Sequence, residues 1–205
     1  MLSLPQSTEV NRRVAKEKLY ANANLTSKLR DIIRDQIEAI YWRNKLADST
    51  FNVSAGENVS ELHVFEIQLR QRYLDKRVLT VIGKAIPYKI LFVLTFEGEA
   101  QVWIEAEETF YKTDWQPVDN LLFKFEGLNL DTVYENLARQ IARGRLGDSG
   151  DISIAVDSDM RRQKLEREIA AIEKKMLREK QFNRQVEIYA ELKRLRVELE
   201  ILSQI

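Results

Sequence analysis

The C-terminal quarter of the chain, residues 159–205, is the feature that most constrains what this sequence can fold into. It contains neither glycine nor proline, the two residues that most often interrupt a helix. Apolar residues recur there at alternating steps of four and three, at Leu165, Ile169, Ile172 and Met176 and again at Ile188, Leu192, Leu195, Leu199 and Leu202. This heptad spacing predicts a long coiled-coil-like helix with an apolar seam.

The two halves of the seam do not share one register, because Met176 and Ile188 are twelve residues apart. A phase break therefore falls near Glu179–Gln185, around Phe182. It is either a stutter in one continuous helix or the turn of a helical hairpin. Since no glycine or proline lies there, we expect the continuous helix and keep the hairpin as the alternative.

An apolar stripe on a helix is stable only when it docks on something. The candidates are the protein's own domain, a second copy of the chain or another protein, and we expect pairing between chains. The nine seam residues are therefore the predicted partner-binding residues.

Three of the seven glycines, Gly144, Gly147 and Gly150, fall just before the tail and predict a linker at residues 144–158. This divides the chain into a globular domain at 1–143, the linker, and a heptad helix at 159–205. Within the domain, periodicity predicts helices at 11–21, 26–46, 75–86 and 129–143. It predicts strands at 51–53, 62–70, 89–96, 99–106 and 121–125, with 111–115 as a loop or edge strand. The expected fold class is α+β or α/β, with a small mixed sheet and flanking helices before the C-terminal helix or hairpin.

Glu66 and Gln68, two apart on the predicted strand 62–70, are the most suggestive candidate site. Nucleases of the restriction-enzyme type place a carboxylate and a lysine at this spacing, with an aspartate upstream, to bind magnesium and activate water. Here Gln68 stands at the lysine position, and Asp48 is the nearby upstream aspartate. A diverged magnesium nuclease centred on Glu66 is therefore one alternative, and a polar strand face without catalysis is the other.

Three weaker signals have both a functional and a structural interpretation. Glu105, Glu107 and Glu108 either hold a hard cation or form a solvated strand edge. His63, the only histidine, shares a strand face with Phe65 and Ile67 and is expected to be a core residue. Tyr73, Lys76, Arg77 and Lys84 mix aromatic and basic side chains, and residues 1–46 hold nine basic and five acidic ones, which gives a weak nucleic-acid-binding module as a further alternative.

Composition excludes several classes of function. The chain has no cysteine, so it has no disulfides, iron–sulfur clusters or thiol nucleophiles, which fits the reducing cytoplasm. Its formal net charge is zero, which argues against strong steering toward nucleic acid. No apolar run is long enough to span a bilayer, and no phosphate-loop signature follows the glycines. We expect no cofactor and lean against an enzyme.

Several stretches together resemble a bacterial family of unknown function. They are Leu4–Thr8, Ile40–Leu46, Phe65–Ile67, Lys84–Phe92, Tyr111–Trp115, Gly127–Asn136 and Glu179–Asn183. The chain departs from the family's pattern at Gly83, where the pattern has aspartate, and at Glu105–Glu107, where it has an aromatic–lysine pair.

The resemblance implies a setting, because such proteins are encoded beside a DNA methyltransferase and a helicase-like protein in restriction–modification or phage-defence loci. It implies no catalytic residues. The resulting hypothesis is a non-catalytic accessory subunit whose C-terminal helix docks a second copy or a methyltransferase or helicase component, with any association with DNA being indirect.

Overall fold

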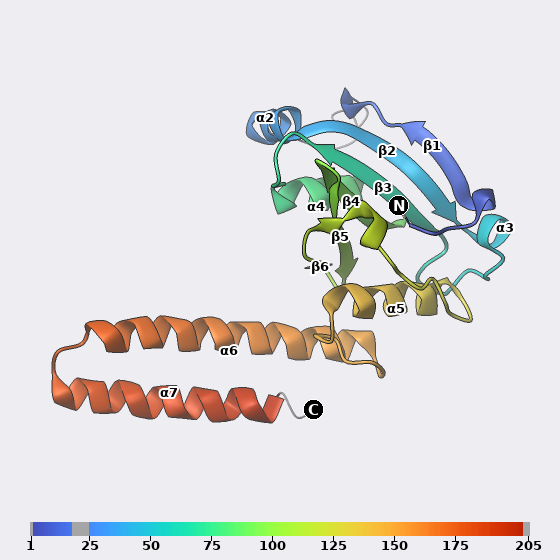
Figure 1. Ribbon diagram of the computed structural model, residues 1–205. Helices are drawn as coiled ribbons and strands as arrows, with labels where there is room; N and C mark the ends of the chain where they lie inside the picture. Colours follow the sequence, from blue (N-terminus) through green and yellow to red (C-terminus); the bar gives the residue numbers. More distant parts are fainter. Residues whose placement is uncertain (1, 18–24, 203–205) are drawn as a thin grey trace. The chain divides into compact units, whose positions relative to one another are not determined.

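The computed structural model describes residues 2–17 and 25–202 of the chain (Figure 1). Contacts divide it into two compact units, Met1–Gly144 and Arg145–Ile205. The first unit holds a mixed β-sheet with helices, and the second holds two long helices. The mixed α and β composition predicted from the sequence is confirmed.

In the first unit, the sheet strands follow one another in the order β1-β2-β3-β4-β5-β6, and β7 also pairs with β5. Neighbouring strands are antiparallel except β3 and β4, which run parallel. Parallel neighbours need a crossover, and α4 supplies it. The elements in chain order are η1 Gln6–Thr8, β1 Glu9–Arg13, α2 Ser27–Gln36, β2 Ile37–Leu46, α3 Asp48–Phe51, β3 Leu62–Leu69, α4 Lys76–Ala85, β4 Lys89–Phe96, β5 Glu99–Ala106, β6 Thr109–Lys112, β7 Gln116–Pro117, η2 Val118–Asn120 and α5 Leu130–Ala142.

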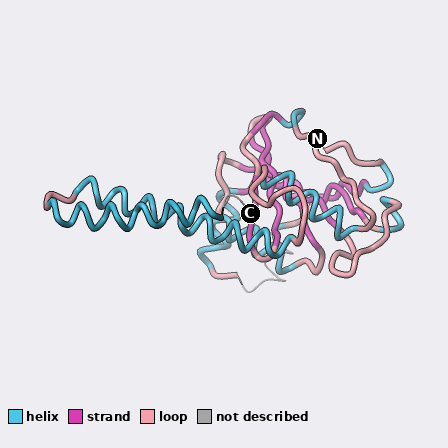
Figure 2. Tube along the Cα trace, turned by 90° about the horizontal axis from the view of Figure 1, so that it is seen from below, coloured by secondary structure: helices cyan, strands magenta, loops and turns pink. Residues whose placement is uncertain are grey.

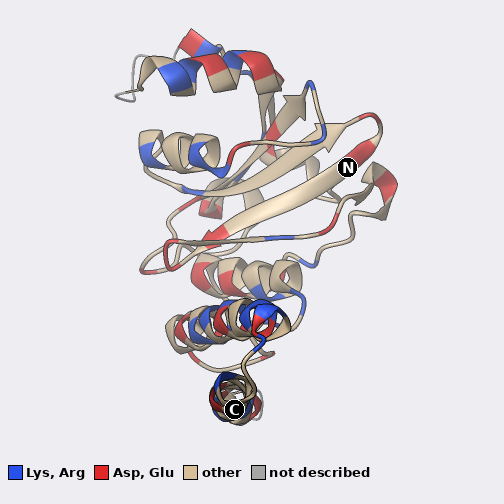
Figure 3. Ribbon diagram, turned by 90° about the vertical axis from the view of Figure 1, so that its left-hand side faces the viewer, with Lys and Arg blue, Asp and Glu red and all other residues tan. Residues whose placement is uncertain are grey.

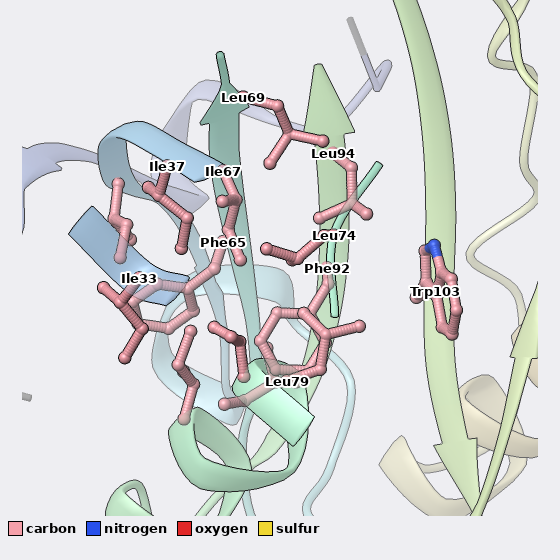
Figure 4. Packing of buried hydrophobic residues seen from close by; sticks show 14 of the residues in the cluster. Ile33, Ile37, Phe65, Ile67, Leu69, Leu74, Leu79, Phe92, Leu94 and Trp103 are labelled. Carbon is pink, nitrogen blue, oxygen red and sulfur yellow. The ribbon is translucent and has the colours of Figure 1, made fainter. Parts of the chain in front are cut away.

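One hydrophobic cluster joins the sheet to α2 and α4. Phe65 and Ile67 of β3 and Phe92 of β4 lie on the same face and are buried against Leu79 of α4 and Ile33 of α2 (Figure 4). The Asp75 side chain accepts the backbone N–H of Arg77 and so caps α4 where the sequence predicted a helix start. The predicted strands at 62–70, 89–96 and 99–106 and the predicted helices at 75–86 and 129–143 are confirmed within a residue or two.

The helix predicted over residues 26–46 is wrong in its second half. It ends at Gln36, and Ile37 has extended backbone angles of φ −105° and ψ 131°. The segment from Ile37 continues as β2, which pairs with β1 on one side and β3 on the other. The apolar residues of this stretch fit either period, and the β-branched and aromatic residues Ile40, Tyr41 and Trp42 pack well in a sheet.

Other local predictions are also wrong. Residues 48–51 form the short helix α3, followed by Asn52 in the left-handed conformation, in place of the strand expected at 51–53. Residues 121–125 have no regular structure. Of the helix expected at 11–21, residues 11–13 belong to β1, while 18–21 lie outside the described residues. By contrast, the loop or edge strand expected at 111–115 is correct, since residues 111 and 112 belong to the edge strand β6 and 113–115 have no regular structure. A turn in which Glu107 and Glu108 both have positive φ precedes β6.

Asp131, in the first turn of α5, holds the loop that precedes β3. Its carboxylate accepts backbone N–H groups from three successive residues, at 2.8 Å from Glu57, 3.1 Å from Asn58 and 2.7 Å from Val59. Gly56 passes so close that a Cβ there would lie 2.2 Å from the Asp131 Cγ. These contacts tie the start of β3 to α5, which itself packs on β5 and β6.

In the second unit, α6 Ile152–Arg178 and α7 Phe182–Leu202 pack side by side as a hairpin (Figures 1 and 2). The expected continuous helix is therefore wrong, and the hairpin alternative is correct. Glu179 leaves the helical conformation with φ −75° and ψ 130°, and its carboxylate accepts the N–H groups of Lys180 and Gln181, both at 2.9 Å. A side chain thus makes the turn that glycine or proline was expected to mark.

The hairpin begins inside the predicted linker. Asp151 caps α6 by accepting the N–H of Ser153 at 2.7 Å, so residues 152–158 are helical and the helix does not start at Asp159. Asp159 is buried and accepts hydrogen bonds from Arg145, Arg162 and Gln163. Burial by itself would raise the pKa of Asp159, but these hydrogen bonds outweigh it and hold the pKa below its usual value.

Replacing Asp131 by alanine should lower the free energy of unfolding by about 2 kcal/mol, because three backbone N–H groups lose a charged acceptor. Urea denaturation followed by circular dichroism measures this loss. Gly56→Ala should destabilise through the same contact, since the new methyl group would overlap the Asp131 carboxylate. Asp157→Ala, at an exposed position of α6, is the control, and equal stability of the Asp131 and Asp157 variants would contradict the assignment.

Candidate functional site

Glu66 lies on β3, the most buried strand of the sheet, and only 4% of its surface is exposed. Its Oε2 accepts a hydrogen bond from Arg43 Nε at 2.6 Å. Its Oε1 accepts hydrogen bonds from Gln68 Nε2 and Thr95 Oγ1, both at 3.2 Å. A buried carboxylate is tolerated only when it is paired and hydrogen-bonded, and this one is fully engaged by protein donors.

Arg43, on β2, is itself held in place. Its Nη1 donates to Asn11 Oδ1 at 3.2 Å. Its guanidinium lies over the Tyr41 ring, with Cζ 4.6 Å from the ring centroid. Asn11 has a positive φ of 47°, at the bulge where the β1–β2 register shifts. Arg43 and Glu66 line a hollow of about 280 Å³ beside β1. The hollow therefore presents a neutralised ion pair rather than a free carboxylate.

The structure does not bring Asp48 to Glu66. Strand pairing sets Tyr41 opposite Glu66 and Leu46 opposite Leu62. Asp48 lies beyond that end of the strand, exposed at the start of α3, so at least about 13 Å of strand length separates it from Glu66. Gln68 does lie beside Glu66, but as a hydrogen-bond donor to its carboxylate. The three residues of the nuclease hypothesis do not converge.

The other acidic candidates do not gather into a metal site either. Within residues 2–17 and 25–202, no group of three or more His, Asp and Glu side chains could hold a metal ion. Glu107 and Glu108 are exposed in the β5–β6 turn, and Glu105 precedes them on β5. In the same described ranges, no helix is long and apolar enough to cross a membrane.

His63 is buried between two aromatic rings. It stacks on Trp42 at 4.9 Å and on Tyr88 at 4.7 Å between ring centroids, and Nε2 lies 2.9 Å from Glu61 Oε2. Lys45 binds the other Glu61 oxygen at 2.8 Å. Burial lowers the pKa of His63, and the Glu61 carboxylate opposes the shift only partly. This matches the expectation of a core histidine, with a carboxylate partner that the sequence pattern had not indicated.

A second hollow, of about 250 Å³, lies near Tyr88. Gly83 and Glu105 line it together with Lys89 and Tyr134. The Tyr134 hydroxyl donates to the Glu105 backbone oxygen at 2.5 Å, and burial raises the pKa of Tyr134. Lys89 lies over the Tyr134 ring at 5.5 Å. Gly83 and Glu105, which are far apart in the sequence, thus meet at one place in the fold.

The basic and aromatic residues proposed for nucleic-acid stacking are largely engaged within the protein. Arg77 pairs with the Asp75 carboxylate at 2.6 Å, and Lys76 lies over the Phe110 ring at 5.4 Å. Tyr73 is exposed in the loop that precedes α4. The set does not form a row of free cations interleaved with rings.

The predicted seam residues pack against one another across the hairpin. Leu165 and Ile169 of α6 and Leu192 and Leu195 of α7 are buried in one cluster, with Ile172, Met176, Leu199 and Leu202 packed against it, and Ile188 is buried as well. The two half-seams therefore serve as each other's partner. A partner bound at the seam would have to replace this contact.

A second apolar stripe runs along the outer face of α7. It consists of Phe182, Val186, Tyr189 and Val197, which are 75%, 53%, 58% and 49% exposed, with Ile201 at its end. At 100° per residue these positions fall on a face turned away from the seam. Sequence reasoning missed this stripe because the stronger heptad pattern on the same helix masks it, although the spacing of 182, 186 and 189 was a signal.

Comparison with known proteins identifies one match. A family model described as Domain of unknown function (DUF4391) matches residues 2–199. No curated protein and no solved structure matches the chain.

Replacing Glu66 by glutamine should lower the free energy of unfolding by about 1–3 kcal/mol, because Arg43 loses its charged partner in a mostly buried site. Magnesium should leave the melting temperature of the unaltered protein unchanged. Thermal melts with and without magnesium test both statements. A magnesium-dependent rise in melting temperature that disappears in Glu66→Gln would instead support the nuclease hypothesis.

Stability should fall as the pH drops below about 6.5, the ordinary pKa of histidine, because the unfolded chain binds a proton that buried His63 resists. The contribution is fully present above that pH and is lost as the pH falls toward the lowered pKa of the folded state. Urea denaturation between pH 7 and pH 5 measures it. His63→Phe, which keeps the stacked ring but cannot titrate, should show a shallower pH dependence, and an identical slope would contradict the assignment.

Proposed function

The chain belongs to the family Domain of unknown function (DUF4391), and we propose that it acts as a non-catalytic interaction subunit. The observation that carries the proposal is the exposed apolar stripe on α7, with Phe182 and Tyr189 among its side chains. Large exposed apolar surface usually marks a site of protein–protein contact, and aromatic side chains often anchor such contacts.

The hairpin is suited to display this stripe. The seam between α6 and α7 is already filled by apolar side chains, and Arg196 of α7 pairs with Glu173 of α6 at 2.7 Å. The two arms therefore support each other, and the outer face of α7 does not need to turn inward to bury apolar surface. Basic and acidic residues are mixed on both helices of the hairpin, which Figure 3 shows end-on. Such a mixed charged surface favours solubility around a local apolar face.

The proposed setting is a DNA restriction–modification or phage-defence assembly in the cytoplasm, and it rests on the resemblance stated above. In that setting the hairpin would dock a methyltransferase component, a helicase component or a second copy of the chain. The engaged Glu66 carboxylate gives the nuclease alternative no support, and the paired Arg77 gives none to direct nucleic-acid binding.

Affinity purification of the tagged full-length chain from its native host tests the proposal. Methyltransferase or helicase components should co-purify with the unaltered protein and be lost with Tyr189→Glu, since a charge at the centre of the stripe opposes apolar docking. Leu177→Glu is the matched control, because Leu177 is also a highly exposed apolar residue of the hairpin but lies on α6. Loss of the components in both variants, or in neither, would reject the α7 stripe as the docking surface.

A further inference from the structure

We propose that the hollow of about 250 Å³ beside Tyr88 binds a guanine base, carried either by a free nucleotide or by an unpaired position of a single strand. A column of stacked rings ends at this hollow, and a carboxylate without an internal partner lines it. The proposal is independent of the α7 stripe, because all residues that line the hollow belong to the first unit.

The column of rings crosses the sheet in strand order. Trp42 of β2 stacks on His63 of β3, with the ring centroids 4.9 Å apart and 19° between the ring planes. His63 stacks in turn on Tyr88, the residue directly before β4, at 4.7 Å and 29°. Each ring therefore lies one strand further along the order β2-β3-β4, and the next position in the column lies toward β5.

Tyr88 is the open end of this column. Its surface is 37% exposed, and His63 is the one ring that stacks on it within residues 2–17 and 25–202. The hollow is lined by Tyr88 but not by His63, so it meets the part of the tyrosine that the histidine leaves uncovered. A planar ring placed there continues the column, and nucleobases stack on aromatic side chains in this way.

Glu105 lies on the strand that the column reaches next. Ile90 of β4 pairs with His63 on one side, and the β4–β5 register places Glu105 on its other side, on the same face of the sheet. The Glu105 Oε2 lies 3.6 Å from the position that a Cβ of Gly83 would take. Its backbone oxygen accepts the Tyr134 hydroxyl, but no side chain of the described ranges pairs with its carboxylate.

Guanine is the base whose edge suits this carboxylate. An ionised carboxylate offers two acceptor oxygens and no donor. Guanine carries two neighbouring donors, N1–H and the N2 amino group, which can engage both oxygens together. Adenine and cytosine set a ring nitrogen acceptor beside their amino group, and uracil and thymine set carbonyls on both sides of their N–H. Each of those bases would turn an acceptor toward Glu105, which disfavours its binding.

The rest of the hollow fits a ligand of this size. The second carboxylate that lines it, Glu61, is already paired with Lys45 and His63, so Glu105 remains as the acceptor for a ligand. Gly83 leaves space on the α4 side, and the loop 58–60 closes another side. Sites for drug-sized ligands measure about 300–1,000 Å³. The smaller hollow here suits one base with part of its sugar and excludes a dinucleotide.

Calorimetric titration of the full-length chain with guanosine monophosphate and adenosine monophosphate tests the proposal. The two nucleotides share sugar and phosphate, so the difference between them measures recognition of the base. The guanine nucleotide should bind at least about tenfold tighter, because two hydrogen bonds to a charged acceptor are at stake. Glu105→Gln should abolish this preference. Equal binding of both nucleotides by the unaltered protein would overturn the proposal.

Two further positions test the location. Gly83→Leu should abolish binding by filling the hollow, while leucine favours the helix more than glycine does, so the chain should stay folded. Tyr88→Ala should weaken binding at least about fivefold, and Tyr88→Phe should preserve it. Tyr73→Ala is the control, because Tyr73 is also an exposed tyrosine but does not line the hollow. Binding that persists in Gly83→Leu would overturn the assignment, and thermal melts check that each variant is folded.

A single-stranded oligothymidylate with one central guanine distinguishes the two sources of the base. Tighter binding of this strand than of guanosine monophosphate, with no binding of the all-thymine strand, would identify an unpaired base as the ligand. Tighter binding of the nucleotide would identify the free form. In either case the binding should be lost in Gly83→Leu. Absence of binding by both probes at millimolar concentration would reject a guanine site in this hollow.

Discussion

The first unit depends on β3 being buried while it carries a carboxylate. This strand pairs antiparallel with β2 and parallel with β4, and all its residues except Gln68 are buried. A charge in that position is costly unless compensated. Arg43 from one neighbouring strand and Thr95 from the other supply the compensation, so the ion pair and its hydrogen bonds connect β2, β3 and β4. The need to compensate Glu66 also fixes the pairing register of β3, because a slip of one residue would turn the Glu66 side chain into the apolar cluster.

Three other carboxylates have a similar structural role. Asp131 collects backbone N–H groups of the loop before β3, and Asp159 collects two arginines at the start of the hairpin. Glu179 forms the hairpin turn by accepting two backbone N–H groups. Acidic residues that resemble catalytic or metal-binding residues in a sequence thus act here as hydrogen-bond acceptors that fix loops, strands and turns.

The hairpin explains why we propose the more exposed stripe, and not the heptad seam, as the surface for partners. Each arm alone would leave its seam in water, and folding back buries both seams within the chain. The outer face of α7 is left with Phe182 and Tyr189 exposed, on a helix supported from behind. In this proposal, stability and recognition use different faces of the same helix.

The sequence by itself determined the elements whose apolar period is unambiguous and whose ends are marked by local chemistry. Strand 62–69 alternates from Phe65 to Leu69, α4 lies between Asp75 and Pro87, and the heptad residues identify helical structure on both sides of the phase break. Tertiary structure decided the rest. Residues 37–46 became a strand because β1 and β3 offer hydrogen bonds on both sides, and such long-range pairing leaves no local signal. Tertiary structure also decided the surroundings of the candidate site residues. Glu66 could be singled out from its spacing to Gln68, but its partner Arg43 is 23 residues away and its distance from Asp48 depends on strand register. Whether a carboxylate is free to bind a metal or engaged in holding the sheet together is set by neighbours that only the folded chain brings within reach.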